Sequence, residues 1–233
     1  MVNTVNNLNG ILNETVDDPE ISTRIASYEM AARLQLSAPE LIDLTQETQE
    51  TLDLYGCDPT KPSFARACLL ARRMVQRGVR FINIIHASWD HHSNLDPELQ
   101  YNAGAVDQPI AALIKDLKQR GLLDSTMVVW GSEFGRTPLG ENRSAGKMNT
   151  GRDHHPFSFS IFMAGGGIKG GQVLGTTDDV GWHAVKDRMH INDFHATLLH
   201  LFGFDHEQLT YRFKGRDFRL TDVGGEIFDQ LIA

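Results

Sequence analysis

Three short polar segments of the sequence carry side chains that could bind a metal ion. They are "WDHHSN", "GSEFGRTP" and "GRDHHP", and the candidate ligands within them are Asp90, His92, Glu133, Asp153 and His154. Carboxylates and imidazoles are the donors that proteins offer to zinc, manganese, magnesium and calcium ions. One such segment would equally suit a turn or a helix cap, but three of them indicate a site for a divalent metal ion of open identity.

Spacing decides which neighbouring side chains can share one ion. Asp90 and His92 are separated by one residue, so in an extended chain their side chains lie on the same side and His91 points away. His154 and His155 are adjacent, and only one of these two imidazoles can readily face the same ion. We favour His154 as the ligand.

Arg136 is the candidate for binding an anion and for a catalytic role. Its guanidinium could form a bidentate hydrogen bond with the oxygens of a phosphate or a sulfate. The alternative is a structural salt bridge with Glu133, three residues earlier in the chain. The sequence leaves both roles open.

Composition argues against several classes of protein. The formal net charge of -8 does not suit a general nucleic-acid binder. No run of eighteen apolar residues is present, so no membrane span is expected, and the first residues lack the pattern of a signal peptide. The two cysteines, Cys57 and Cys68, are too few for a disulfide framework and lack zinc-binding spacing.

Hydrophobic periodicity and capping residues predict the elements that position the polar segments. Helices are expected over residues 19–38, 40–56, 62–78, 97–120 and 190–203, so that residues 1–60 form a helical region. Short runs rich in β-branched residues predict buried strands over residues 79–86, 126–131 and 157–164.

The first two strands and the helix between them form a predicted βαβ unit, in which the strands are parallel and adjacent or nearly so. Ligands of such sheets bind beyond the carboxyl ends of the strands, where "WDHHSN" and "GSEFGRTP" fall. "GRDHHP" precedes its strand and reaches the same edge only if the loop over residues 139–149 crosses the top of the sheet. The glycines of "AGGGIKGG" are expected to form a turn.

Four segments together carry a family resemblance: "WDHHSN", "GLLDSTMVVWGSEFGRTP", "GRDHHPFSFSIFMAGGGIKGG" and "DFHATLLHLFG". They resemble a sulfatase-related bacterial family, domain of unknown function 1501, of the alkaline phosphatase-like superfamily. The resemblance covers about residues 64–217. It implies an α/β fold with a mostly parallel sheet flanked by helices, a single domain over residues 1–233, and a metal-dependent ester hydrolase site.

The resemblance also implies roles for particular residues. Asp90 and His92 match the first metal-binding pair of the superfamily, and His154 matches its late histidine. Glu133 stands where a second aspartate is expected. Phe134 stands where histidine or asparagine is expected, which removes a ligand from a second metal site.

The nucleophile of the superfamily has no counterpart in the sequence. In the superfamily an early strand supplies an aspartate and then a serine, threonine or modified cysteine, whereas no predicted strand precedes residue 79 here. "CDPTK", which begins at Cys57, only faintly resembles a sulfatase signature and has Lys61 in place of arginine. We therefore expect this chain to be the C-terminal part of a longer protein. The N-terminal strand segment would belong to the longer protein and be absent from this chain. The resemblance is compatible with export of that parent protein.

The sequence thus predicts a metal-dependent hydrolase-type domain for sulfate or phosphate esters. Its partner would be an anionic ester of a small molecule or of a polysaccharide. Neither a nucleic-acid partner nor a membrane span is expected, and the oligomeric state is open. The alternative is a catalytically degenerate binding module for an anionic, sulfated polysaccharide, favoured by Phe134 and by the absent nucleophile. A purely structural domain is a third option.

Overall fold

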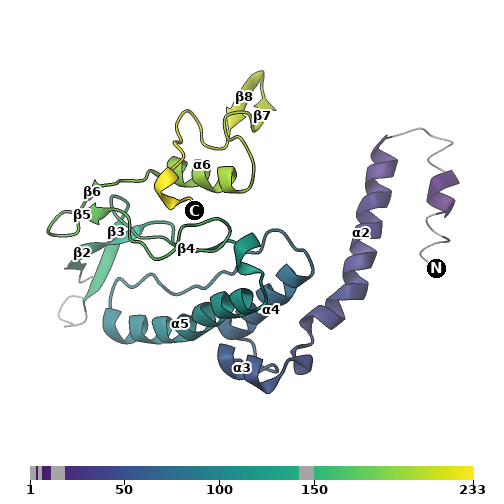
Figure 1. Cartoon of the computed structure of the whole chain (residues 1–233), viewed down its shortest axis with the longest axis horizontal. Helices are drawn as coiled ribbons and strands as arrows, with labels where there is room; N and C mark the ends of the chain where they lie inside the picture. Colours follow the sequence, from purple (N-terminus) through teal and green to yellow (C-terminus); the bar gives the residue numbers. More distant parts are fainter. Residues whose placement is uncertain (1–3, 5–6, 12–18, 142–149) are drawn as a thin grey trace.

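The computed structural model describes residues 4, 7–11, 19–141 and 150–233, which form a mixed α/β arrangement. The longer helices are α2 (Pro19–Ile42), α3 (Gln49–Tyr55), α4 (Phe64–Gln76), α5 (Leu95–Gln119) and α6 (Ile191–Leu201). Short 3-10 turns are η1 (Leu44–Gln46), η2 (Leu123–Ser125) and η3 (Asp229–Leu231). The strands are β1 (Val128–Trp130), β2 (Gly135–Glu141), β3 (Gly151–His155), β4 (Phe162–Ala164), β5 (Thr176–Thr177), β6 (Ala184–Lys186), β7 (Thr210–Phe213) and β8 (Arg216–Arg219). Helices α3, α4 and α5 form one layer, and the strands and α6 lie over it (Figure 1).

The hydrophobic core lies among α3, α4 and α5. Helix α4 begins where the hydroxyl of Ser63 accepts the backbone N–H of Arg66 at 3.0 Å, a typical N-cap. Its apolar face places Leu69 in the same buried cluster as Leu117 of α5. Full burial of one leucine contributes about 1.5–3 kcal/mol, so this layer supplies much of the stability.

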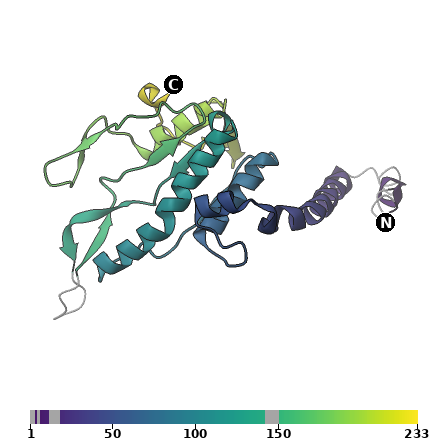
Figure 2. The ribbon, with the colours of Figure 1, turned by 60° about the horizontal axis from the view of Figure 1, so that its bottom comes forward.

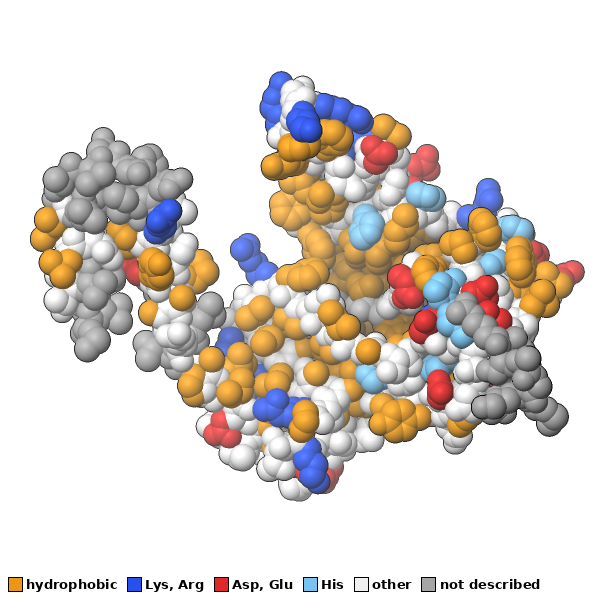
Figure 3. Space-filling model, turned by 180° about the vertical axis from the view of Figure 1, so that it is seen from behind, with side chains coloured by type: hydrophobic (Ala, Val, Ile, Leu, Met, Phe, Trp, Pro, Cys, Tyr) orange, Lys and Arg blue, Asp and Glu red, His pale blue; other side chains and the backbone are white. Residues whose placement is uncertain are grey.

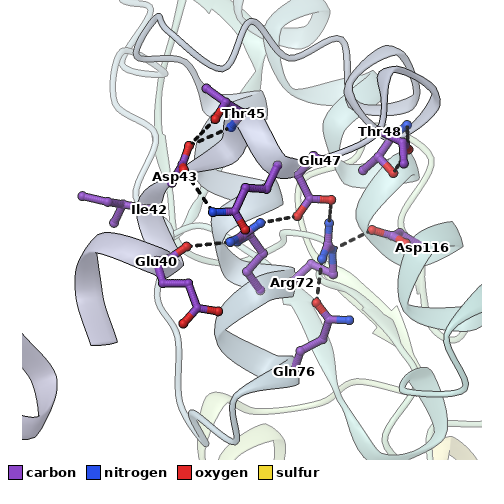
Figure 4. A network of polar contacts seen from close by, with 12 residues as sticks. Glu40, Ile42, Asp43, Thr45, Glu47, Thr48, Arg72, Gln76 and Asp116 are labelled. Carbon is purple, nitrogen blue, oxygen red and sulfur yellow. Dashed lines mark hydrogen bonds and ion pairs between the residues drawn. The ribbon is translucent and has the colours of Figure 1, made fainter. Parts of the chain in front are cut away.

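A network of buried ion pairs joins these helices (Figure 4). Arg72 and Arg73 of α4 each place a guanidinium nitrogen 2.6 Å from a carboxylate oxygen of Glu47. Arg72 also lies 2.8 Å from Asp116 of α5, which accepts the hydroxyl of Tyr55 at 3.1 Å. Buried charges are tolerated when they are paired and hydrogen-bonded, as these are.

Helix α2 projects away from the rest of the molecule, as two views show (Figures 1 and 2). The sequence predicts a new helix after Pro39, but α2 runs through Pro39 and ends at Ile42. The second expected helix is then divided into η1 and α3. Its predicted end at Gly56 is confirmed, because this residue has the left-handed φ of 63° that favours glycine at a helix C-terminus.

The described residues form four sheets, each of two antiparallel strands: β1–β4, β2–β3, β5–β6 and β7–β8. Residues 79–86, expected to be a strand, belong to no strand, and their side chains Phe81 and Ile85 are 80% and 83% exposed. The expected strands over 126–131 and 157–164 are shorter, as β1 and β4, and pair antiparallel with each other. The described residues therefore contain no parallel pairing, and the alkaline phosphatase-like sheet stays a prediction.

The expected glycine turn follows β4 and lies close to the residues that precede β1. Gly165 and Gly166 have φ values of 73° and 55°, and an added Cβ at either position would collide with residues 123–127. The chain can thus fold closely back against the start of β1. None of the helices in the described part of the chain is long and apolar enough to cross a membrane.

Candidate metal centre

The β2–β3 hairpin carries two of the predicted site residues next to each other. Arg136 of β2 is directly opposite His154 of β3 in the antiparallel register, and side chains opposite each other in such a pair lie close together. The sequence predicts "GRDHHP" as a loop before a strand, but residues 151–155 are themselves strand β3. The segment 139–149 is not wholly a loop either: residues 139–141 belong to β2, and 142–149 lie outside the described residues.

The segment that carries Asp90 and His92 is fixed from two sides. On one side, Asn102 of α5 donates to the carbonyl oxygen of Ser88 at 2.6 Å and lies 3.2 Å from His91. His91 is buried there, and thus points away from Asp90 and His92 as the spacing predicts.

On the other side the segment packs against β3. The backbone N–H of Arg152 donates to the carbonyl oxygen of His91 at 2.9 Å. Gly151 permits this approach, since an added Cβ would collide with the backbone carbonyl of His92. A glycine in β3 therefore allows His92 to reach the hairpin.

Three donor atoms converge at this place. Asp90 Oδ1 lies 3.0 Å from His92 Nε2 and 2.9 Å from His154 Nε2, and the two nitrogens are 3.2 Å apart. Ligands of one ion with bonds of about 2.0–2.2 Å are separated by about 3 Å, so the triangle has the size of one face of a coordination shell. Asp90, His92 and His154, all predicted ligands, could hold one divalent ion. Figure 3 shows imidazole and carboxylate side chains gathered at this end of the molecule.

Arg136 borders the triangle. Its Nη1 lies 2.7 Å from Asp90 Oδ1, whereas its Nη2 is 3.9 Å from Glu133 Oε1. The salt bridge with Glu133, one of the two roles that the sequence leaves open, is thus the longer of its two ion pairs. The hydrogen bond from His154, followed by that from Arg136, lowers the pKa of Asp90 well below its usual range, which keeps this carboxylate ionised.

Two other predicted ligands lie outside the triangle. The Glu133 carboxylate is exposed and accepts the hydroxyl of Ser132 at 2.6 Å, which is the main reason for its lowered pKa. Asp153 Oδ1 lies 3.9 Å from His92 Nδ1, on the far side of that ring, and accepts the backbone N–H of His154 at 2.8 Å. The structure therefore places Glu133 and Asp153 beside the triangle.

Glu141 is the residue of this site that sequence reasoning missed. Its Oε2 lies 2.7 Å from His92 Nδ1. It falls at the end of β2, in the segment assigned to a loop, and the hairpin register that brings it here has no short-range signal in the sequence.

Phe134 packs against the triangle. Its ring centroid lies 4.5 Å from that of His154 and 5.7 Å from the guanidinium carbon of Arg136. The neighbouring His155 faces the opposite way: it is buried and its Nε2 contacts the carbonyl oxygen of Trp182.

Neither cysteine belongs to this centre. Both lie in the helical core, where burial raises the pKa of Cys57 and raises that of Cys68 to about 12. A thiolate nucleophile from either residue is therefore disfavoured.

Fold and site together define a mixed α/β protein with an exposed carboxylate–imidazole cluster beside an arginine. The sequence matches, over residues 1–232, the family described as "Protein of unknown function (DUF1501)", and the chain belongs to that family. No curated protein and no solved structure matches the chain.

Proposed function

We propose that this chain is a metal-dependent hydrolase-type domain that acts on sulfate or phosphate esters. The observation that carries the proposal is the convergence of Asp90, His92 and His154 within 2.9–3.2 Å of one another. Two imidazoles and one carboxylate suit zinc better than magnesium, calcium or manganese, which prefer oxygen donors. The relation to the alkaline phosphatase-like superfamily is part of this proposal.

Each residue of the centre has a distinct role in the proposal. Asp90, His92 and His154 would hold the ion, which when bound would neutralise charge on an ester oxygen. Arg136 stands beside the carboxylate and offers a planar set of N–H donors that fits two oxygens of a sulfate or phosphate. Phe134 packs against both His154 and Arg136, so it restricts their rotation.

Metal analysis and turnover test the proposal together. The full chain is loaded with zinc or manganese, and hydrolysis of an aryl sulfate and an aryl phosphate is measured. His92→Ala and His154→Ala are expected to abolish metal binding and turnover, whereas His200→Ala, which removes an exposed imidazole from α6, leaves both unchanged. Turnover that persists in the first two variants would refute the assignment.

A second candidate is a non-catalytic module that binds an anionic polysaccharide. It is favoured by the burial of both cysteines and by the position of Phe134 over His154. Binding of a sulfated polysaccharide that depends on Arg136, without turnover by the metal-loaded chain, would support this module over the hydrolase.

A further inference from the structure

We infer that Glu141 is a positioning residue of the metal centre: its carboxylate holds His92 through Nδ1, so that Nε2 faces Asp90 and His154. This inference rests on the proposed function for its consequence, which is tighter metal binding. The contact itself is a hydrogen bond of 2.7 Å between Glu141 Oε2 and His92 Nδ1.

The two partners are the least exposed side chains of the centre. His92 is 14% exposed and Glu141 21%, whereas Asp90 is 62% exposed. A charge-assisted hydrogen bond that is partly shielded from water is stronger and better fixed than an exposed one. Glu141 is therefore the group that sets the ring orientation of His92.

The chemistry of imidazole then determines which nitrogen is free. A neutral ring carries one N–H and one lone pair, and a carboxylate at Nδ1 selects the form with the proton on Nδ1. Asp90, 3.0 Å from Nε2, competes for that proton, but Glu141 is closer, at 2.7 Å from Nδ1, and its contact is less exposed. The lone pair is then left on Nε2, which is also 3.2 Å from His154 Nε2. A carboxylate behind a ligating imidazole recurs in metal sites because it fixes the tautomer and raises the basicity of the ligand.

A second ion between His92, Glu141 and Asp153 is the competing interpretation, since their donor atoms also lie close together. It would require His92 to give a lone pair at both nitrogens, which a neutral ring does not have. Asp153 Oδ1 is also 3.9 Å from Nδ1, compared with 2.7 Å for Glu141. One ion with Glu141 behind it fits the distances better than two.

The hairpin explains why Glu141 is in place. Glu141 is opposite Gly151 in the β2–β3 register, and Gly151 is the residue against which the backbone of His92 packs. The same strand pair thus admits the main chain of His92 and presents the carboxylate to its side chain.

Zinc affinity and the tautomer of His92 are measured in the full chain, as wild type and as Glu141→Ala, Glu141→Gln and Glu226→Ala. Zinc binding is followed by competition with a chromophoric chelator, and the tautomer by ¹⁵N NMR of the metal-free protein. Glu141→Ala is expected to weaken zinc binding about 10–100-fold and to move the proton of His92 towards Nε2. Glu141→Gln keeps an acceptor for Nδ1–H and is expected to restore the tautomer and part of the affinity. Glu226→Ala removes an exposed glutamate elsewhere and is expected to match wild type.

Unchanged affinity and an unchanged tautomer in Glu141→Ala would overturn the inference, as would binding of two zinc ions with loss of one of them in that variant. If wild type binds no zinc but the tautomer of His92 still differs between wild type and Glu141→Ala, the contact between Glu141 and His92 is supported and the proposed function is refuted. Circular dichroism of each variant separates these outcomes from misfolding, and Glu141→Gln serves if Glu141→Ala does not fold.

Discussion

Two groups of charged side chains in this molecule differ in how their charges are matched. In the helical layer, both oxygens of Glu47 are used, one by Arg72 and one by Arg73, and Asp116 takes a further nitrogen of Arg72. At the β2–β3 end, a single oxygen of Asp90 has a guanidinium and two imidazoles around it.

Burial divides the two groups in the same way. The side chain of Arg72 is 3% exposed and that of Asp90 62%. Charges that are buried and matched pair by pair hold elements together, whereas donors that converge on one exposed point are arranged for a species that arrives from solution. The four predictions that follow test this contrast, beginning with the largest expected effect on stability.

Glu47→Ala is expected to lower the free energy of unfolding by about 3–5 kcal/mol, because two buried arginines lose their shared partner. Urea denaturation at neutral pH measures the change. Glu50→Ala, on the first turn of α3 and outside the network, is the control and is expected to stay within about 0.5 kcal/mol of wild type. A loss below about 1 kcal/mol for Glu47→Ala would contradict the claim that these buried ion pairs stabilise the helical layer.

Gly151→Ala is expected to cost about 1–3 kcal/mol and to weaken metal binding, because the new Cβ collides with the backbone of His92. Gly170→Ala is the matched control, since an added Cβ there meets no atom within 4 Å. Denaturation and zinc titration of both variants provide the test. Equal behaviour of the two alanine variants would show that the approach of His92 to β3 does not matter.

Acid is expected to destabilise the helical layer through Glu47. Burial raises the pKa of this carboxyl, but the hydrogen bonds and charges of Arg72 and Arg73 outweigh burial, so its folded-state pKa is lowered. A lowered pKa contributes stability above the unfolded value of about 4.3, and this contribution is lost as the pH falls through the folded value. Urea denaturation between pH 7 and pH 3 is expected to show a fall in stability that is shallower in Glu47→Gln; identical slopes would contradict this.

Asp90→Asn is expected to have the smallest effect on the metal-free protein, within about 0.5 kcal/mol, because its carboxylate is exposed. The stability gained on adding zinc is instead expected to differ between wild type and Asp90→Asn. Wild type is expected to gain about 2.7 kcal/mol at a free zinc concentration one hundred times the Kd, and Asp90→Asn much less. Thermal denaturation with and without zinc measures both quantities, and an equal gain in the two proteins would exclude Asp90 as a ligand.

Helices α4, α5 and α6 could be predicted because their signals are local, whereas the helix break expected at Pro39 is wrong. Ser63, Gly56 and the apolar spacing of α4 and α5 depend on residues within a turn or two of one another. The strands could not be predicted equally well, because a strand exists only where a partner lies beside it. Residues 79–86 have the composition of a buried strand yet pair with none in the described chain.

The residues of the candidate site also differ in how well the sequence predicts them, according to whether the signal is local. Residue type and spacing pointed to Asp90, His92 and His154, which the structure brings together. Glu133 and Asp153 have the same chemistry but lie beside the triangle, and Glu141 was assigned to a loop. These three depend on the register and side-chain direction of the β2–β3 hairpin, which are set by packing far along the chain.

The most direct test of the central claim is a crystal structure of the chain grown with zinc and measured at the zinc absorption edge. We predict one strong anomalous peak about 2.0–2.2 Å from Asp90 Oδ1, His92 Nε2 and His154 Nε2. A zinc ion bound only at other residues, or no peak at a saturating concentration of zinc, would contradict the account.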